Sequence, residues 1–161
     1  MSCLSLGLLF AFIVAERDLG ASLQDQIQVE LQKQGQIIQS SLGPLSQYSD
    51  LNSLKDETDN LAEASQSRIT LINSSGAVIS DSNIDVDDLD KIDNHSNRPE
   101  VIDAQNNGMG WSRRFSDTIQ QEMLYFAIVD PSSTQQGVIR LAVPYNYFDQ
   151  AFRSLNTPII L

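Results

Sequence analysis

The apolar residues in the first quarter of the chain follow the period of a helix. Between residues 16 and 42 they recur at steps of four and seven, which places them in one stripe: Leu19, Leu23, Ile27, Leu31, Ile38 and Leu42. Gly43 and Pro44 then interrupt the pattern, because proline lacks a backbone donor and glycine favours a helix end. The stripe predicts a long helix that either covers the rest of its own chain or forms the seam of a symmetric dimer.

Two shorter helices are predicted further along. The first extends to about Gln66 and carries three leucines on one side, Leu51, Leu54 and Leu61. The second begins at Pro99, because the fixed φ and missing N–H of proline suit the first helical position, and it reaches about Gln105. Glu100 in its first turn suits the positive end of the helix dipole. Residues 106–108 close this helix.

The strands follow a period of two. Residues 68–72 alternate apolar and polar side chains, which predicts a half-buried strand. Residues 73–76 are typical of a hairpin turn in which Gly76 supplies a positive φ, and residues 77–81 form the partner strand. After an acidic loop over residues 82–93, with one helical turn around Leu89, three more strands are predicted at 111–116, 122–129 and 138–144, the last two joined by a polar loop at 130–137.

Both ends of the chain are apolar. Residues 4–15 are almost uninterrupted in apolar character but shorter than the roughly 20 residues that cross a bilayer. We expect residues 1–15 to be the truncated end of a first transmembrane helix, the alternative being a buried helix start. Residues 146–161 are expected to form an exit helix that runs into a truncated second span, with Phe148, Ala151, Phe152 and Leu155 on one face.

Composition and charge exclude several classes of protein. The 161 residues carry a net charge of -11, which argues against nucleic acid and anionic lipid as partners, since both require clustered Lys and Arg. Cys3 is the single cysteine, so no intrachain disulfide can form. The sequence contains no phosphate-cradling loop and no histidine-centred phosphoacceptor helix. We therefore expect no cofactor and no enzymatic activity from this chain. The absence of a recognisable spacing of nucleophile and base argues against a hydrolase.

Three groups of polar residues are candidates for chemistry. His95, the single histidine, is either a titrating base or pH sensor, or a residue that organises its loop and lines a pocket. Arg98, Arg113, Arg114 and Arg140 either form an anion pocket or pair with carboxylates, for which Asp81, Glu100 and Asp117 are available. The third group is the acidic cluster Asp85, Asp87, Asp88, Asp90 and Asp93, which lacks the glycine and terminal glutamate of a calcium loop. It is either a solvated face, which we predict, or a membrane-proximal acidic patch bridged by divalent cations.

Five segments in a fixed order carry a resemblance to a known family. They are Arg68 to Ser82, the motif Asn94-His95-Ser96-Asn97-Arg98-Pro99-Glu100-Val101, Arg114 to Thr118, Met123 to Ala127 and Gly137 to Pro144. Strand, glycine turn, strand, polar loop with a proline-started helix and three further strands is the order of a PAS-like sheet. The set resembles the extracytoplasmic sensor domain of phosphate-regulon-type bacterial histidine kinases, within the Cache (PAS-like) superfamily.

The resemblance implies a fold and a function. The fold is α+β, with a long N-terminal helix and a five-stranded antiparallel PAS-like sheet. Residues 16–66 would supply the signalling and dimerisation helices, residues 67–145 the sensor core, and flanking spans would anchor the domain on the outer side of a bacterial membrane. The implied ligand is small and anionic or polar, and the implied ligand-binding residues are Arg98, Arg114, Tyr125, His95 and Ser116.

Two rival interpretations remain open at this point. The same fold serves as the sensor of a chemoreceptor or of another transmembrane receptor. Alternatively, the chain is a spacer that dimerises through Leu19, Leu23, Ile27 and Leu31 without binding a ligand.

Overall fold

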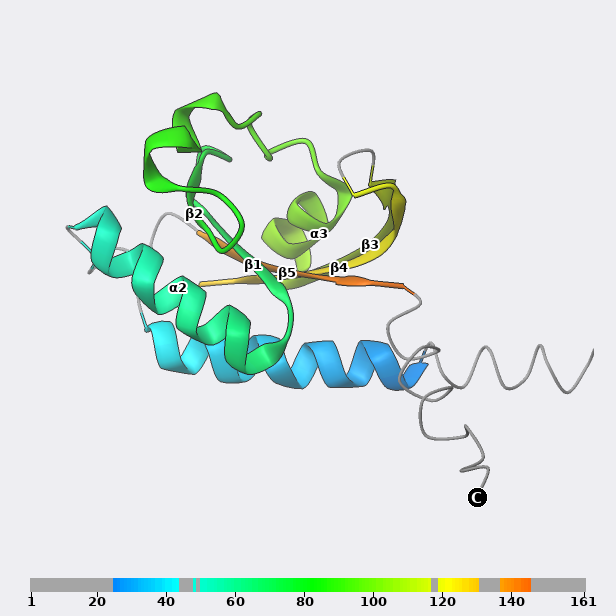
Figure 1. The fold of residues 1–161 in the computed structure, drawn as a ribbon. Coiled ribbons are helices and arrows are strands. Elements are labelled where there is room, and N and C mark those ends of the chain that lie inside the picture. Colours follow the sequence, from blue (N-terminus) through cyan, green and yellow to red (C-terminus); the bar gives the residue numbers. More distant parts are fainter. Residues whose placement is uncertain (1–24, 44–47, 49, 117–118, 131–136, 146–161) are drawn as a thin grey trace, which may run out of the picture. The chain divides into compact units, whose positions relative to one another are not determined.

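The computed structural model describes residues 25–43, 48, 50–116, 119–130 and 137–145 (Figure 1). The chain divides into two compact units, residues 1–30 and 31–161, and the second contains the sheet, α2, α3 and residues 31–42 of the N-terminal helix. The elements in order are a helix over residues 25–42, α2 (Leu51–Ser65), β1 (Arg68–Ile72), β2 (Val78–Asp81), the 3-10 helix η2 (Val86–Lys91), α3 (Pro99–Asn107), β3 (Met109–Ser116), β4 (Gln121–Val129) and β5 (Val138–Pro144).

The five strands form one antiparallel sheet in the order β2-β1-β5-β4-β3. The last strand therefore lies between the first strand and the β3–β4 hairpin, so that Thr70 pairs with Arg140. Two helices precede this sheet and a third lies within its sequence, which confirms the α+β prediction. The observed bounds of the five strands differ from the predicted ones by no more than two residues.

Local chemistry explains where the elements begin and end. Asp50 caps α2 by accepting a hydrogen bond from the Asn52 N–H at 3.0 Å. The β1–β2 turn is closed by the Asn73 side chain, which accepts from the Ala77 N–H at 3.0 Å, and Gly76 takes a φ of 86° there. Pro99 begins α3, and Gly108, with a φ of 87°, ends it.

One face of the sheet is covered by helices that precede it in sequence (Figure 1). Gly35 of the N-terminal helix lies against the ring of Phe126, and a Cβ at that position would come within 2.9 Å of the Phe126 Cδ1. Gln39 donates from its Nε2 to the Val129 carbonyl at 2.5 Å. On α2, the Thr58 hydroxyl accepts from the Ser80 hydroxyl of β2 at 2.9 Å. Residues 31–42 and α2 therefore pack on the sheet within one molecule.

The predicted apolar stripe is buried where the structure describes it in this unit. Leu31, Ile38 and Leu42 are all 2% exposed or less. For these residues the structure favours the covering role over a dimer seam. Leu19 and Leu23, on which the dimer prediction also depends, lie outside the described residues, so dimerisation stays a prediction.

The prediction that the first strand is half-buried is wrong. Ile69, Thr70, Leu71 and Ile72 are all fully buried, so both faces of β1 are covered. The alternation of apolar and polar residues is present, but the polar Thr70 faces a buried network of charged side chains rather than water.

No helix within the described ranges is both long enough and apolar enough to cross a membrane. The predicted spans, residues 1–15 and the end of 146–161, lie outside those ranges, as does the predicted exit helix beyond residue 145.

Candidate ligand-binding site

Polar side chains gather on the second face of the sheet, on the same side as α3; we call it the α3 face. Residues that share it are fixed by the pairing register, which aligns Arg68 with Ala142, Ala142 with Tyr125, and Tyr125 with Ser112. Because side chains alternate along a strand, the same face carries Thr70, Arg140, Arg114, Ser116 and Met123.

Glu100, at the start of α3, is the centre of this arrangement. Its carboxylate is fully buried and accepts two hydrogen bonds from Arg114, at 3.0 and 3.1 Å, and one from the Ser112 hydroxyl at 2.5 Å. The Arg140 Nη1 lies 3.6 Å from its Oε1. We call these three side chains, Arg114, Arg140 and Ser112, the carboxylate clamp.

The clamp continues into a chain of polar contacts across the sheet. Arg140 donates to the Thr70 hydroxyl at 3.0 Å, and that hydroxyl donates to Asp81 at 2.7 Å. Asp81 also accepts from Arg68 through Nε at 2.9 Å and Nη2 at 3.0 Å. Together with the clamp, this polar chain joins groups on β2, β1, β5 and β3.

Tyr125 of β4 completes the chain. The Arg114 guanidinium lies 4.0 Å from the centre of its ring, and the Arg140 guanidinium lies 5.3 Å from it. All five strands therefore contribute a side chain to one connected polar arrangement.

Glu100 and Arg140 are both held in their charged forms. Burial by itself would raise the pKa of Glu100, but the Ser112 hydrogen bond and the charges of Arg114 and Arg140 outweigh it, so the pKa is lowered. Burial lowers the pKa of Arg140 to about 10, against the attraction of Glu100. Arg140 and Glu100 are thus both charged at neutral pH.

The cover formed by α3 and the loop before it is tightly seated. A Cβ at Gly110 would overlap the Glu100 carbonyl and lie 2.7 Å from the Asp103 Cβ. A Cβ at Gly76 would lie 2.6 Å from the Ser96 N. Both glycines therefore permit backbone segments to approach more closely than any other residue would allow.

His95 helps to hold this loop in place. Its backbone N–H donates to the Gly76 carbonyl at 2.7 Å, and its ring Nδ1 contacts the Asp93 carbonyl at 2.7 Å. Since a carbonyl can only accept, Nδ1 carries the proton in this arrangement. Burial, together with the charges of Arg140 and Arg98, lowers the pKa of His95 to about 4, so the ring is neutral at pH 7.

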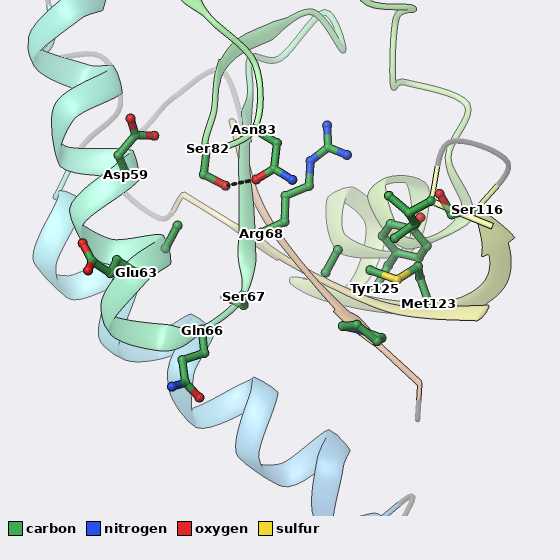
Figure 2. Close-up of a pocket in the computed structure, with 14 residues that line it drawn as sticks. Asp59, Glu63, Gln66, Ser67, Arg68, Ser82, Asn83, Ser116, Met123 and Tyr125 are labelled. Atoms are coloured by element: carbon green, nitrogen blue, oxygen red, sulfur yellow. Dashed lines mark hydrogen bonds between the residues drawn. The ribbon is translucent and has the colours of Figure 1, made fainter. Parts of the chain in front are cut away.

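Beside the seated cover, the α3 face opens into a pocket of about 450 Å³ (Figure 2). One wall comes from α2 and the residues after it and includes Asp59, Ala62 and Glu63. Arg68, Ser82 and Asn83 form the middle, and the far wall consists of Ser116, Ile119, Met123, Tyr125, Ala142 and Pro144. The pocket thus joins the polar chain at two of its members, Arg68 and Tyr125.

A second hollow of about 460 Å³ lies beside β2 and has mainly apolar walls, including Val86, Leu89 and Ile92. Asp90 borders it, and all five aspartates of the predicted acidic cluster are exposed, as expected of a solvated face. Within the described ranges, no three His, Cys, Asp or Glu side chains lie close enough together to hold a metal ion. Converging polar groups distinguish the first pocket, which is therefore the candidate ligand site.

The structure separates the five predicted site residues. Tyr125 and Ser116 line the pocket. Arg114 lies behind Tyr125 and pairs with Glu100, one of the three structural partners considered from sequence. His95 and Arg98 belong to the loop, and the Nε of Arg98 is buried without a hydrogen-bond partner. Whether these five bind a ligand stays a prediction.

Sequence reasoning missed Arg68, which lines the pocket and is linked to its rear through Asp81. The signal was available: Arg68 shares the period-two face of the first strand with Thr70. The four arginines considered for an anion pocket all follow residue 97 in the chain.

Comparisons with known proteins give similarity in fold only. No protein-family model matches the chain. A search of curated proteins likewise returns no match. Several solved structures are similar to it, among them a receptor and a kinase sensor domain. The extracellular ligand binding receptor from Desulfohalobium retbaense has a TM-score of 0.62 at 10% sequence identity, over 83% of this chain and 25% of that one.

The sensor domain of the Vibrio cholerae histidine kinase DctB has a TM-score of 0.64 at 16% identity, over 90% of this chain and 61% of that one. This chain therefore spans about a quarter of the receptor and about three fifths of the kinase sensor domain. Both similarities concern the fold alone, and they agree with the α+β fold expected from sequence.

Proposed function

We propose that this chain is the extracytoplasmic sensing module of a membrane-bound bacterial histidine kinase, and that it binds a small polar or anionic molecule in the pocket beside α3. The observation that carries the proposal is the polar chain behind the pocket. Arg68 and Tyr125 line the pocket, and through their partners they reach all five strands. A molecule in the pocket would contact a connected set of charges rather than isolated surface groups.

The proposed mechanism is a shift between two packings of the domain. A ligand moves such an equilibrium only by binding one packing more tightly, and typical couplings are about 1–3 kcal/mol. In this domain the ligand would contact α2 through Ala62 and the sheet through Tyr125. Residues 31–42 pack on the sheet at Phe126 and Val129, directly behind the strand that carries Tyr125. A small movement of β4 would therefore reach the N-terminal helix, and through it the predicted first span.

The segments around the pocket differ in how closely they pack on the rest of the domain. The loop over residues 94–98 and α3 are fixed at Gly76 and Gly110, where backbone segments are in close contact. The pocket wall formed by α2 is less buried, since Asp59 and Ala62 are half-buried and Glu63 is exposed. We assign the ligand-dependent movement of the pocket walls to α2 and β4.

The test fills the pocket from the α2 wall. Ala62→Trp should abolish the thermal stabilisation produced by any small molecule that binds the purified chain in a screen of organic acids, sugars and amines. Ala64→Trp is the matched control, since Ala64 lies on α2 but is exposed and does not line the pocket. If a molecule binds both variants as it binds the unaltered chain, the pocket is not the site. If no molecule in the screen binds the unaltered chain, the result favours the alternative that the chain is a spacer without a ligand.

Assignment to a kinase has its own test. The gene sequence that follows residue 161 should encode a membrane span, a HAMP-like linker and a histidine-centred phosphoacceptor helix. A methyl-accepting or cyclase domain in that place would assign the same sensor to another class of receptor.

A further inference from the structure

Glu100 is held as a bound carboxylate ligand would be. Its two oxygens accept three hydrogen bonds, two of them from the forked guanidinium of Arg114, and its side chain is fully buried. Bidentate pairing of this kind is the geometry by which arginine recognises free carboxylates. In this chain the carboxylate comes from α3, while all three side chains of the carboxylate clamp come from the sheet.

The clamp is oriented by contacts that do not depend on Glu100. Arg114 is stacked on Tyr125, and Arg140 donates to Thr70. Arg140 is 3% exposed and Arg114 is 28% exposed in its side chain. The donors would therefore keep their positions if the carboxylate were exchanged, which is the requirement for a preorganised anion site.

Local charge leaves room for an external carboxylate. In the polar chain, the three guanidinium groups of Arg68, Arg114 and Arg140 face the carboxylates of Glu100 and Asp81. The Nε of Arg140 is buried without a hydrogen-bond partner, so the donor capacity of the clamp is not used up. An uncompensated buried charge is costly, so Glu100 can leave only if another anion takes its place.

The clamp adjoins the pocket. Ser116 lines the pocket and lies two residues after Arg114 on the same face of β3, and Tyr125, which also lines the pocket, has its ring 4.0 Å from the Arg114 guanidinium. At the opposite wall are Glu63 and Asp59, the latter paired with Lys55. A ligand would therefore enter with its carboxylate toward Arg114 and its neutral or cationic end toward α2.

We propose that the carboxylate clamp is a binding site for small carboxylates, and that Glu100 occupies it when no ligand is present. A carboxylate that enters through the pocket replaces Glu100 on Arg114, Arg140 and Ser112, and Glu100 with the first turn of α3 is released. The consequence for signalling rests on the proposed function, whereas the site itself does not. In this scheme the first turn of α3 moves only when an external carboxylate takes the place of Glu100. This agrees with the close packing of α3 in the ligand-free state.

Chemical rescue tests the site. Glu100→Ala should lower the melting temperature of the chain, and 100 mM sodium acetate at pH 7 should restore about 3 °C or more of the loss relative to 100 mM sodium chloride. The unaltered chain should gain less than about 1 °C, because Glu100 already fills the clamp. The control is Glu100→Ala combined with Arg114→Ala, which lacks the main donor and should show no rescue. Equal effects of acetate and chloride, or equal rescue of the double variant, would overturn the proposal.

A second measurement uses the unaltered chain, in case Glu100→Ala does not fold. The amides of Val101 and Ile102 donate to the Arg98 carbonyl in the first turn of α3. With increasing acetate, their hydrogen exchange should speed up several-fold relative to the same concentration of chloride, while exchange in β1 and β5 should stay constant. Unchanged exchange at 200 mM acetate would refute the replacement of Glu100.

The two proposals fail in different ways. Rescue of Glu100→Ala by acetate, together with ligand binding that survives Ala62→Trp, would keep the clamp and remove the pocket as the site of sensing. Ligand binding that is lost in Ala62→Trp, without rescue by acetate, would keep the pocket and remove the clamp.

Discussion

The two halves of the α3 face are built from the same strands but differ in what covers them. In the covered half, Val101 and Ala104 of α3 pack on an apolar cluster with Ile72, Ala127 and Val138, and Gly110 lets the helix backbone approach β3. In the open half, Arg68, Met123 and Tyr125 face a pocket. β4 contributes Ala127 to the first half and Tyr125 to the second, two residues apart.

Side-chain size explains this difference. A helix can seat on a sheet where the facing residues are alanine, valine and glycine, because small side chains let the two backbones come close. Where the facing residues are arginine and tyrosine, their length keeps other segments away, and space remains between them. Glu100, Arg114 and Arg140 lie at the boundary between the halves, and there a carboxylate of the cover meets guanidinium groups of the open half. Ion pairs hold the cover to the sheet at this boundary, whereas close backbone packing at Gly110 holds it in the covered half.

The largest expected effect comes from a substitution at Gly110, where α3 packs most closely on β3. Gly110→Ala should cost about 3 kcal/mol of unfolding free energy, because its Cβ would overlap the Glu100 carbonyl and lie 2.8 Å from the Ala104 N, and backbone atoms cannot move aside as a side chain does. The control is Gly108→Ala, where a Cβ meets nothing within 4 Å and the cost of about 1 kcal/mol comes only from the positive φ. Urea unfolding measures both. Equal losses in the two variants would show that α3 is not tightly seated.

Low pH is the second way to destabilise the covered half. The pKa of His95 is lowered from its ordinary value of 6.5 to about 4 in the folded chain, mainly by burial and by the charge of Arg140. Between pH 6.5 and pH 4 the unfolded chain therefore binds a proton at this residue more readily than the folded chain does, and the protein becomes less stable as the pH falls. The stability from neutral His95 is therefore present above pH 6.5 and is lost as the pH falls toward 4, by up to about 3 kcal/mol. Glu100, whose pKa is also lowered, adds a loss in the same direction below 4.5.

Urea titrations between pH 7.5 and 4 measure this dependence. His95→Gln should flatten the curve between pH 6.5 and 4.5 and leave the loss at lower pH, where carboxylates such as Glu100 are protonated. A curve of unchanged steepness in this variant would show that other groups carry the dependence. The groups that face His95 in the structure are Arg98, Arg140 and Glu100.

Substitutions at two neighbouring arginines test whether the ion pairs at the boundary stabilise the fold. Arg114 pairs with buried Glu100 and Arg113 with exposed Glu122. Arg114→Ala should lower the unfolding free energy by about 2 kcal/mol in the absence of ligand, because it leaves the buried carboxylate of Glu100 with fewer donors. Arg113→Ala removes a guanidinium that pairs with exposed Glu122 and should cost no more than about 1 kcal/mol. Thermal unfolding of both variants distinguishes the roles. An Arg114 variant as stable as the Arg113 variant would refute the structural role of the clamp.

The smallest expected effect compares two serines on the same face of β3. Ser112 donates to Glu100, so Ser112→Ala should cost about 1–1.5 kcal/mol. Ser116 lines the open pocket, so Ser116→Ala should change the unfolding free energy by less than about 0.5 kcal/mol. The Ser116 variant should, however, bind pocket ligands with altered affinity in calorimetry. A larger loss of stability at Ser116 than at Ser112 would reverse the assignment of the two halves.

The sequence by itself determined the local structure of this chain. Pro99 and Gly108 bound α3, and Asn73 with Gly76 forms the first turn, because these residues have backbone preferences that no distant contact is needed to impose. The order of strands followed from these signals and from the resemblance to PAS-like sensors. Tyr125 and Ser116, named from that resemblance, do line the pocket.

Only the tertiary structure decided what lies opposite each face and which charges pair. The period of the first strand placed Arg68 and Thr70 on one face, but it could not show that this face is buried or that Arg140, 70 residues later, donates to Thr70. Arg114 had three candidate carboxylates in sequence, and the register of β3 against β4, with α3 seated at Gly110, selected Glu100. Such choices depend on distances between segments far apart in the chain. Periodicity describes one element at a time and contains no such distance.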